Sequence, residues 1–424
     1  MTPETLNASM LVANERKSFM LNAVFCILIA LFLISLNGLQ KFPPLFFVNK
    51  VSAGLIVILG FLYSGRLYIP KLLKLFGVFI VVSFFSGFFT AIDQELLFDN
   101  AMKLLQLLLL LTAISQFYIF RGNLDGLMIA LIINALVLAF AGKFLSPDLV
   151  FSGKIERYSS ITNNSNGFAF QLLLGVIGTL FFYRKNSIIV KLLVAAGVGM
   201  LMYYIAISGS RKSLAGFAIV VTAWVYFSFN LKKSLQIATV LFLMALAAGS
   251  YVFALLEDTA VVQRLYQLES DSGAADIRAI LYREAFEVFQ EHPFFGVGLD
   301  NFRRYSVSGL YAHSNYMELL ADTGIIGFAL FFAVYLLVWR NSDRLVRLFE
   351  RDETAIFLSG INKCIIILFL VIGAGAVQYD NIAHWTLLLF PIILQEKAAL
   401  MVSEATQEEE EKELAMDETG SVSA

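Results

Sequence analysis

The chain has 424 residues, of which 58% are hydrophobic and only 15% are charged, and its mean hydropathy is +0.75. Soluble domains are about 45–50% apolar and about 25% charged, so the composition excludes an ordinary water-soluble protein. The formal net charge of −2 leaves no basic field for a nucleic acid. We therefore expect an all-α polytopic membrane protein that contacts membrane lipids and no nucleic acid.

The N-terminal segment, residues 1–18, is polar and is predicted to be cytoplasmic. The first apolar run after it is long enough to span a membrane and lacks a small-residue cleavage site, so it does not have the pattern of a cleavable signal. The two cysteines, Cys26 and Cys364, lie within apolar runs and have neither metal-ligand spacing nor a disulfide-framework pattern. We interpret both as small buried hydrophobic residues.

Apolar runs long enough to cross about 30 Å of hydrocarbon predict about twelve transmembrane helices. They lie near 19–37, 46–64, 75–92, 101–120, 126–146, 167–183, 189–208, 213–230, 235–255, 319–339, 355–377 and 382–395. The first nine make up a bundle over residues 19–255, and the last three a bundle over 319–395. A long loop, 256–318, separates the two groups.

The distribution of Lys and Arg predicts which side each turn faces. With residues 1–18 in the cytoplasm, alternate turns carry the basic residues Arg66, Lys71, Lys74, Arg121, Arg184, Lys185, Lys191, Lys232, Lys233, Arg340, Arg344, Arg347 and Arg351. The acidic segment 91–100 and the loop 256–318 then fall on the opposite side. The C-terminal segment 396–424 is acidic and lacks aromatics, and we predict a disordered cytoplasmic tail.

Two short polar segments are predicted to lie on the same outer side as the large loop. Residues 153–171 contain Arg157 and a cluster of Asn, Ser and Thr, and residues 207–216 place Arg211 and a lysine between two spans. Cations on the outer side oppose the usual positive-inside bias. We expect a negatively charged partner to hold them there.

The large loop itself is predicted to contain an amphipathic helix over 275–290. Its apolar positions Ile277, Leu281, Ala285 and Val288 recur every three or four residues, and Arg278 and Tyr282 are four apart. An arginine fork matches the paired oxygens of a diphosphate or carboxylate. Any one of the outer arginines could equally pair with a nearby acid or a lipid head group.

His313 is one of three histidines and stands just before the tenth predicted span, followed by Ser314, Glu318 and Asp322. A histidine has an unperturbed pKa near neutrality, which suits removal of a proton from a hydroxyl. An interfacial histidine with a satisfied hydrogen bond is the alternative. The acids follow at five and nine positions, so neither is expected on its helix face. We interpret His292 and His384 as structural.

These motifs together resemble the O-antigen ligase and polymerase family. His313-Ser314, nine residues, Gly324, two residues and Gly327 resembles its H-[NSQ]-x9-G-x-x-G signature. RAILYREAFEVFQEHPFFGVGLDNF (278–302) is similar to its R-x-x-x-W…hPl-GvG-xx-xF segment, with Tyr282 in place of the usual Trp. SGSRKSLAG matches an arginine segment at Arg211, and RYSSITNNSNGFAF matches an asparagine segment at Asn166.

The resemblance implies a glycosyltransferase of the bacterial inner membrane, multi-pass and active on the periplasmic face. The donor would be a glycan on undecaprenyl diphosphate. The acceptor would be lipid A–core for a ligase or another lipid-linked glycan for a polymerase. Some relatives use a protein hydroxyl instead, and a few were proposed as transporters.

The resemblance also suggests roles for individual residues. His313 would be the catalytic base or orienting group, and Arg211, Arg278 and Arg157 would bind the donor diphosphate. Ser314, Asn166 and Tyr282 would support them. Gly324 and Gly327 are expected to allow close helix packing at the entry of the span. We expect an inverting, metal-independent transfer with no cofactor, because arginines can neutralise the diphosphate in place of a metal.

Two other classes remain open. A transporter of a small anion would use the outer cations as an attractant, and it predicts charged or broken helices at mid-membrane. Only Lys363 clearly lies within a predicted span, which weakens this alternative. A scaffold would leave the outer Arg and His residues without a role. The glycan and its linkage are not predicted.

Overall fold

The computed structural model describes residues 8–12, 19–38, 42, 46–65, 67–144, 151–152, 157–162, 164–185, 187–240 and 272–420. The long helices are α1 (Phe19–Gly38), α2 (Phe46–Ser64), α3 (Lys71–Thr90), α4 (Gln94–Phe120), α5 (Leu124–Ala141), α7 (Ser165–Phe181), α8 (Ile188–Ile207), α9 (Arg211–Phe227), α12 (Ser272–Glu291), α14 (Asn315–Leu348), α15 (Glu353–Gly373) and α16 (Ile382–Gly420). The short elements are η2 (Ala8–Val12), η6 (Gly142–Phe144), η7 (Phe182–Arg184), α13 (Phe302–Tyr305), and the antiparallel strands β1 (Phe151–Ser152) and β2 (Arg157–Tyr158).

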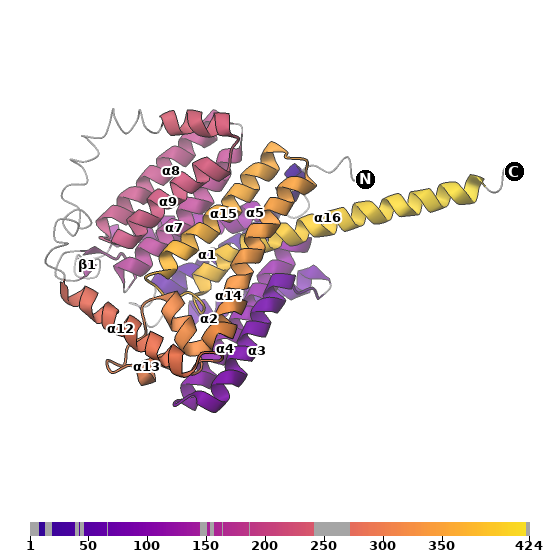
Figure 1. The fold of residues 1–424 in the computed structure, drawn as a ribbon. Coiled ribbons are helices and arrows are strands. Elements are labelled where there is room, and N and C mark those ends of the chain that lie inside the picture. Colours follow the sequence, from indigo (N-terminus) through magenta and orange to yellow (C-terminus); the bar gives the residue numbers. More distant parts are fainter. Residues whose placement is uncertain are drawn as a thin grey trace.

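The protein is all-α in its architecture, and ten helices of the described residues are long and apolar enough to cross a membrane. Together with α9 they pack side by side in one bundle, with α9 against α15, α5 against α7, and α14 against α3 and α15 (Figure 1). The predicted span 213–230 corresponds to α9, whose 17 residues leave it outside the ten. Most of the predicted span 235–255 lies outside the described residues.

Several helices begin at an Asn or Asp whose side chain accepts a hydrogen bond from an early backbone N–H. Asp93 caps α4, Asn123 caps α5, Asn164 caps α7 and Asp352 caps α15. The first N–H groups of a helix have no partner within it, so such a cap stabilises the start by about 1 kcal/mol. These caps determine the residue at which each of these helices begins, and so which residues lie at its N-terminal end.

The interior of the bundle is built from aromatic and aliphatic side chains. Trp385 of α16 is fully buried between α3 and α14, with its ring centroid 3.9 Å from that of Phe76 and 6.0 Å from that of Phe331. Cys26 and Cys364 are buried and free, which confirms their interpretation as core residues. Lipid-facing helices such as α2 and α8 leave many apolar side chains exposed instead.

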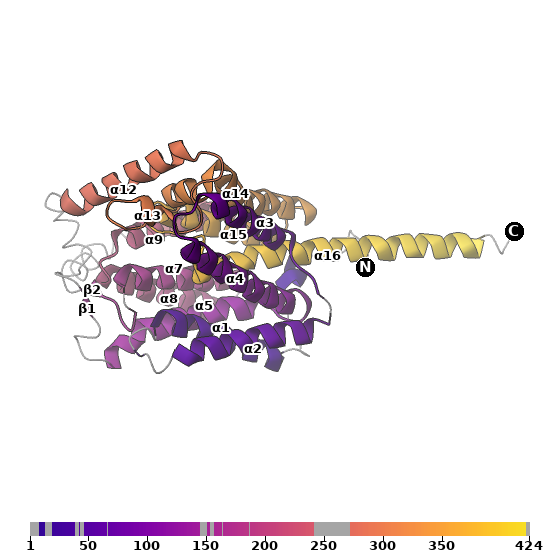
Figure 2. The ribbon, with the colours of Figure 1, turned by 90° about the horizontal axis from the view of Figure 1, so that it is seen from below.

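The helix predicted over 275–290 is α12, which lies beside α13 and the start of α14 (Figure 2). Leu281, Ala285 and Val288 bury its apolar face in a second, smaller core with residues of the loop and of α14, whereas Ile277 is half exposed. The small core holds α12 against one end of the bundle.

The predicted disorder of the tail 396–424 is wrong over most of its length. Helix α16 continues from the last span to Gly420 and projects away from the bundle (Figure 1). Ala, Glu, Leu, Met and Lys dominate this segment, and they are strong helix formers whatever their hydropathy. A segment without an apolar period can therefore extend a helix that the preceding span has already nucleated.

Candidate active site

A cleft of about 370 Å³ opens at one end of the bundle, where segments from distant parts of the chain meet. It is lined by Asn164, Asn166, Gly167, Phe170, Lys212, Arg278, Asp300, Arg303, Tyr311, His313, Glu318, Ile372, Gly375, Ala376, Val377, Gln378, Tyr379, Asp380 and Asn381. The structure thus brings together three of the residues selected from the sequence: His313, Arg278 and Asn166.

His313 stands in the cleft in an unusual backbone conformation. Its φ is +56°, in the left-handed region that a non-glycine residue occupies at a cost of about 1–3 kcal/mol. Its half-buried ring lies against that of Tyr311, with 4.0 Å between centroids. Burial lowers the pKa of His313, and the positive charges of Arg278 and Lys212 lower it further. The imidazole is therefore held in its neutral form, which can accept a proton.

Glu318 fixes the turn that presents His313. Its buried carboxylate accepts a hydrogen bond from the backbone N–H of Ala312 at 2.5 Å, and its own N–H donates to the carbonyl of Ser314 at 3.0 Å. The sequence placed Glu318 on a different helix face from His313. The turn preceding α14 folds back over the helix start, so the carboxylate acts on the backbone next to the histidine.

Three cations line the cleft, Lys212 from α9, Arg278 from α12 and Arg303 from α13. Lys212, near the start of α9, donates from Nζ to the carbonyl of Gly375 at 2.7 Å. Arg278 enters from α12. Of the neighbouring pair at the start of α9, Lys212 lines the cleft, and Arg211, the residue predicted from the sequence, does not. Consecutive residues of a helix point about 100° apart, so only one of the two can face the cleft.

Arg157 contributes to the cleft indirectly, by a hydrogen bond to Asn166. Its Nε donates to the carbonyl of Ser208 at 3.0 Å, and its guanidinium donates to Oδ1 of Asn166, also at 3.0 Å. Asn166 in turn donates its backbone N–H to the α7 cap Asn164 at 2.8 Å. Arg157 therefore holds the asparagine that lines the cleft and does not itself line it.

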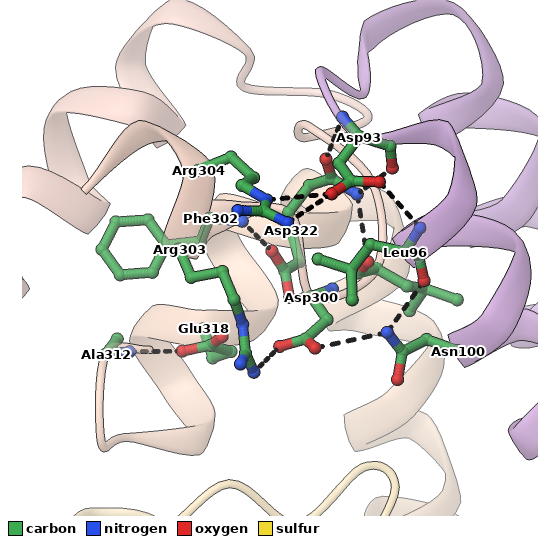
Figure 3. Close-up of polar contacts among 12 residues, drawn as sticks. Asp93, Leu96, Asn100, Asp300, Phe302, Arg303, Arg304, Ala312, Glu318 and Asp322 are labelled. Carbon is green, nitrogen blue, oxygen red and sulfur yellow. Dashed lines mark hydrogen bonds and ion pairs between the residues drawn. The ribbon is translucent and has the colours of Figure 1, made fainter. Parts of the chain in front are cut away.

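A loop on the other side of the cleft is anchored by carboxylates (Figure 3). Asp322 accepts hydrogen bonds from the backbone N–H groups of Asp300 at 2.8 Å and Phe302 at 2.9 Å. Arg303 forms an ion pair with Asp300. These contacts fix two charged side chains of the loop, Asp300 and Arg303, at the cleft wall.

The same loop is also tied to the turn between α3 and α4. The Nε of Arg304 donates to Asp93 at 2.9 Å (Figure 3). Asn301 Oδ1 accepts the backbone N–H of Asp93 at 2.9 Å. The Leu96 N–H and the Arg304 guanidinium lower the pKa of Asp93. This turn, residues 91–93, begins the acidic segment 91–100 of the sequence and acts as a fixed support for the loop.

Gly324 and Gly296 form a backbone interlock between α14 and the segment that follows α12. Gly324 interrupts α14 with φ +60° and ψ −169°, and a Cβ there would lie 2.4 Å from the carbonyl carbon of Phe294. A Cβ on Gly296 would lie 2.4 Å from the backbone of Asp322. Only glycine fits both positions. Gly324 was expected to pack a helix; instead it breaks one to admit a loop.

Backbone hydrogen bonds close this interlock. The N–H of Ile325 donates to the carbonyl of Pro293 at 2.9 Å, and that of Gly298 donates to the carbonyl of Asp322 at 2.8 Å. They replace helical bonds that the break removes. Gly327, one turn later, faces α3, where a Cβ would lie 3.4 Å from the hydroxyl of Ser83. The glycine pair Gly296 and Gly298 and the glycine pair Gly324 and Gly327 are therefore neighbours in the structure.

The segment between α15 and α16, residues 374–381, closes the cleft and was missed from the sequence. Tyr282 donates to the Ala374 carbonyl at 3.1 Å, and the Gln378 N–H donates to Oδ1 of Asn315 at 2.8 Å. Asp380 lines the cleft, and its pKa is raised by burial and then by Asp300. The sequence offered one signal for this segment: the polar stretch QYDN (378–381) connects the predicted spans 355–377 and 382–395 on the outer side.

The remaining predicted residues have structural positions. Tyr282 and Ser314 do not line the cleft; Ser314 is the buried residue that precedes α14. His384 is buried inside α16, with Nε2 2.8 Å from the Tyr335 hydroxyl and Nδ1 3.1 Å from the Gln378 carbonyl. Both of its ring nitrogens are thus engaged, in agreement with a structural role. Within the described ranges, no three His, Cys, Asp or Glu side chains are grouped as metal ligands.

Comparison with known families gives one match, and it covers part of the site. Residues 196–332 match the O-antigen ligase family, which confirms the resemblance found in the motifs. The match contains α9, α12 and the start of α14, with Lys212, Arg278 and His313. Asn166 precedes it and the 374–381 segment follows it. No curated protein matches the chain.

Proposed function

We propose that this chain, whose residues 196–332 match the O-antigen ligase family, transfers a glycan from undecaprenyl diphosphate to an acceptor hydroxyl. The acceptor is lipid A–core if the protein is a ligase, or another lipid-linked glycan if it is a polymerase. The cleft then faces the periplasm, at the outer face of the bacterial inner membrane. Loop 256–318 would be periplasmic in this arrangement.

The observation that carries the proposal is the meeting of His313 with Lys212 and Arg278 in one cleft at the end of the membrane helices. A diphosphate needs fixed cations to neutralise it as it departs. A hydroxyl nucleophile needs a base of near-neutral pKa within reach. The cleft supplies both on walls held by buried hydrogen bonds.

In the proposed step, the acceptor oxygen attacks the anomeric carbon while the bond from that carbon to the diphosphate oxygen breaks. His313 takes the hydroxyl proton, and the diphosphate leaves with its charge balanced by Lys212 and Arg278. Asn166, held by Arg157, donates hydrogen bonds to the donor. One direct displacement inverts the anomeric configuration.

An anion transporter would attract its substrate with the outer cations and would need charged residues within the spans, where Lys363 was the clear case in the sequence. That lysine forms an ion pair with Asp343 at 2.6 Å and lies over the rings of Phe227 and Trp339. The pairing indicates a role in joining α15 to α14. A protein O-oligosaccharyltransferase would use the same donor chemistry and differ only in its acceptor.

Surface and protein glycans of a deletion strain, complemented with the wild-type chain or with His313→Ala, test the proposal. A ligase leaves lipid A–core unmodified while lipid-linked polymer accumulates. A polymerase leaves single-repeat chains, and an oligosaccharyltransferase leaves unmodified protein. Wild-type must restore the glycan and His313→Ala must not. Glycans unchanged by the deletion would overturn the proposed function.

A further inference from the structure

A second, smaller pocket of about 140 Å³ lies at the end of the bundle opposite the cleft. Helices α9 and α15 connect the two sites: α9 has Lys212 at the cleft and is followed by Ser228 at the pocket, and α15 has Ile372 at the cleft and Thr354 at the pocket. Sixteen or more residues of helix separate the members of each pair, roughly 25 Å. The pocket therefore lies at the other membrane surface.

Two lysines of this pocket have no carboxylate partner. Lys191 of α8 places its Nζ 5.4 Å from the ring centroid of Tyr183, and Lys233 places its Nζ 5.3 Å from that of Phe229. Neither forms an ion pair with any described residue, whereas Arg184, also in the lining, is paired with Asp125. The charge of Arg184 is thus balanced by Asp125, whereas the charges of the two lysines can attract an anion into the pocket.

The rest of the lining suits a phosphate attached to an apolar body. Ser228 is buried, and its hydroxyl has no hydrogen-bond partner in the described part of the chain. Asn230 and Thr354 add further polar groups, and Ile356 and Phe357 supply an apolar wall. The lining has one carboxylate, that of Glu353, which opposes an anion.

We propose that this pocket binds the phosphate of an anionic phospholipid head group. The ends of membrane spans lie at head-group depth, and basic pockets between such ends attract anionic lipids. Lys191 and Lys233 contact the phosphate oxygens from two sides, while Phe357 and Ile356 face the glycerol and upper acyl chain. The lipid joins α8 and the helical segment 231–240 to the start of α15.

The test is lipid retention by the full-length protein in nanodiscs of phosphatidylglycerol and phosphatidylcholine, read by native mass spectrometry. Lys191→Gln and Lys233→Gln are each expected to lower retained phosphatidylglycerol about fivefold. Lys232→Gln removes the same charge from an exposed neighbour outside the lining and should leave retention unchanged. Equal losses in all three variants would overturn the proposal.

Glu353→Gln provides a test that misfolding cannot imitate. Removal of the single carboxylate of the lining should raise phosphatidylglycerol retention, and unchanged or lower retention contradicts the proposal. Inorganic phosphate at millimolar concentration gives the last arm. If it displaces the lipid, or stabilises lipid-free protein in a Lys191-dependent way, the pocket is a site for a soluble anion and the lipid assignment is wrong.

Discussion

The two ends of the bundle use charged residues in different ways. At the cleft, His313 and Asp300 have φ values of +56° and +60°, and surrounding hydrogen bonds hold them there. At the opposite end, Glu350 and Arg351 also have positive φ, but both are exposed in the turn between α14 and α15. At the cleft, the strained backbone directs the side chains of His313 and Asp300 into the lining. At the other end, the strained backbone only reverses the direction of the chain between two helices.

This difference supports the proposal that the chemistry takes place at the cleft end. Non-glycine residues in the left-handed region persist only where the surroundings over-determine them, and such positions gather at active sites. Glu318 and Asp322 are both buried and are used to hold backbone N–H groups next to the strained residues. At the opposite end, Arg184 pairs with Asp125, while Lys191 and Lys233 form no ion pair with a described residue.

Replacement of His313 is expected to have the largest effect, and it tests whether the strained residues at the cleft end serve catalysis. His313→Ala should lower glycan transfer by about 10²–10⁴-fold, because it removes the proposed base. His292→Ala is the matched control, since His292 does not line the cleft. Transfer by membranes containing equal amounts of each variant measures the effect. A His313→Ala protein with near wild-type transfer would place the base elsewhere.

The interlock that supports the cleft gives the next largest effect. Gly324→Ala should destabilise the protein by about 2–5 kcal/mol, because positive φ and a backbone clash both oppose a Cβ. Gly309→Ala has a similar φ of +68° with open space around it, and only about 1–2 kcal/mol should be lost. Thermal unfolding in detergent compares them, and equal shifts would show that the close approach to Phe294 is unimportant.

The sequence predicted the spans well because long apolar runs report burial in lipid without any tertiary information. It predicted the tail wrongly, because charge and hydropathy do not report that a span can extend a helix past the membrane to Gly420. Its glycine motif was correctly located, yet the break at Gly324 depends on a segment some 30 residues earlier. Local spacing cannot reveal such a contact.

The lining of the candidate cleft includes residues that a sequence motif had selected, and it also includes residues that only tertiary contacts bring there. His313 and Arg278 follow from the family resemblance, and both line the cleft. Arg211 was preferred over Lys212 because the motif names the arginine, but the rotation of α9 decides which one faces inward. Asp380 lies outside every motif and enters the cleft through contacts of the 374–381 segment.

The proposed donor-binding role of the cleft cations predicts a smaller, substrate-dependent effect. Arg278→Gln should weaken the apparent affinity for the diphosphate donor about 10- to 100-fold, the loss expected for one charge-assisted contact. Arg283→Gln on the same helix is exposed and outside the lining, so it serves as control. Donor titrations at saturating acceptor measure both. Equal donor affinities in the two variants would remove Arg278 from the diphosphate site.

The smallest effect is a displacement of the pH profile, and its sign follows from the charges around His313. Burial lowers the pKa of His313 most, and the positive charges of Arg278 and Lys212 lower it further. Only the neutral imidazole can take a proton. Transfer should therefore fall as the pH drops through that pKa. Lys212→Gln removes one of the two cations, so the pKa rises and the acid limb of the kcat/KM profile moves to higher pH. Lys232→Gln, in the helical segment 231–240 at the opposite end of the bundle, should leave the limb in place. An acid limb that stays fixed in Lys212→Gln, or moves to lower pH, would mean that His313 does not set the rate through its neutral form.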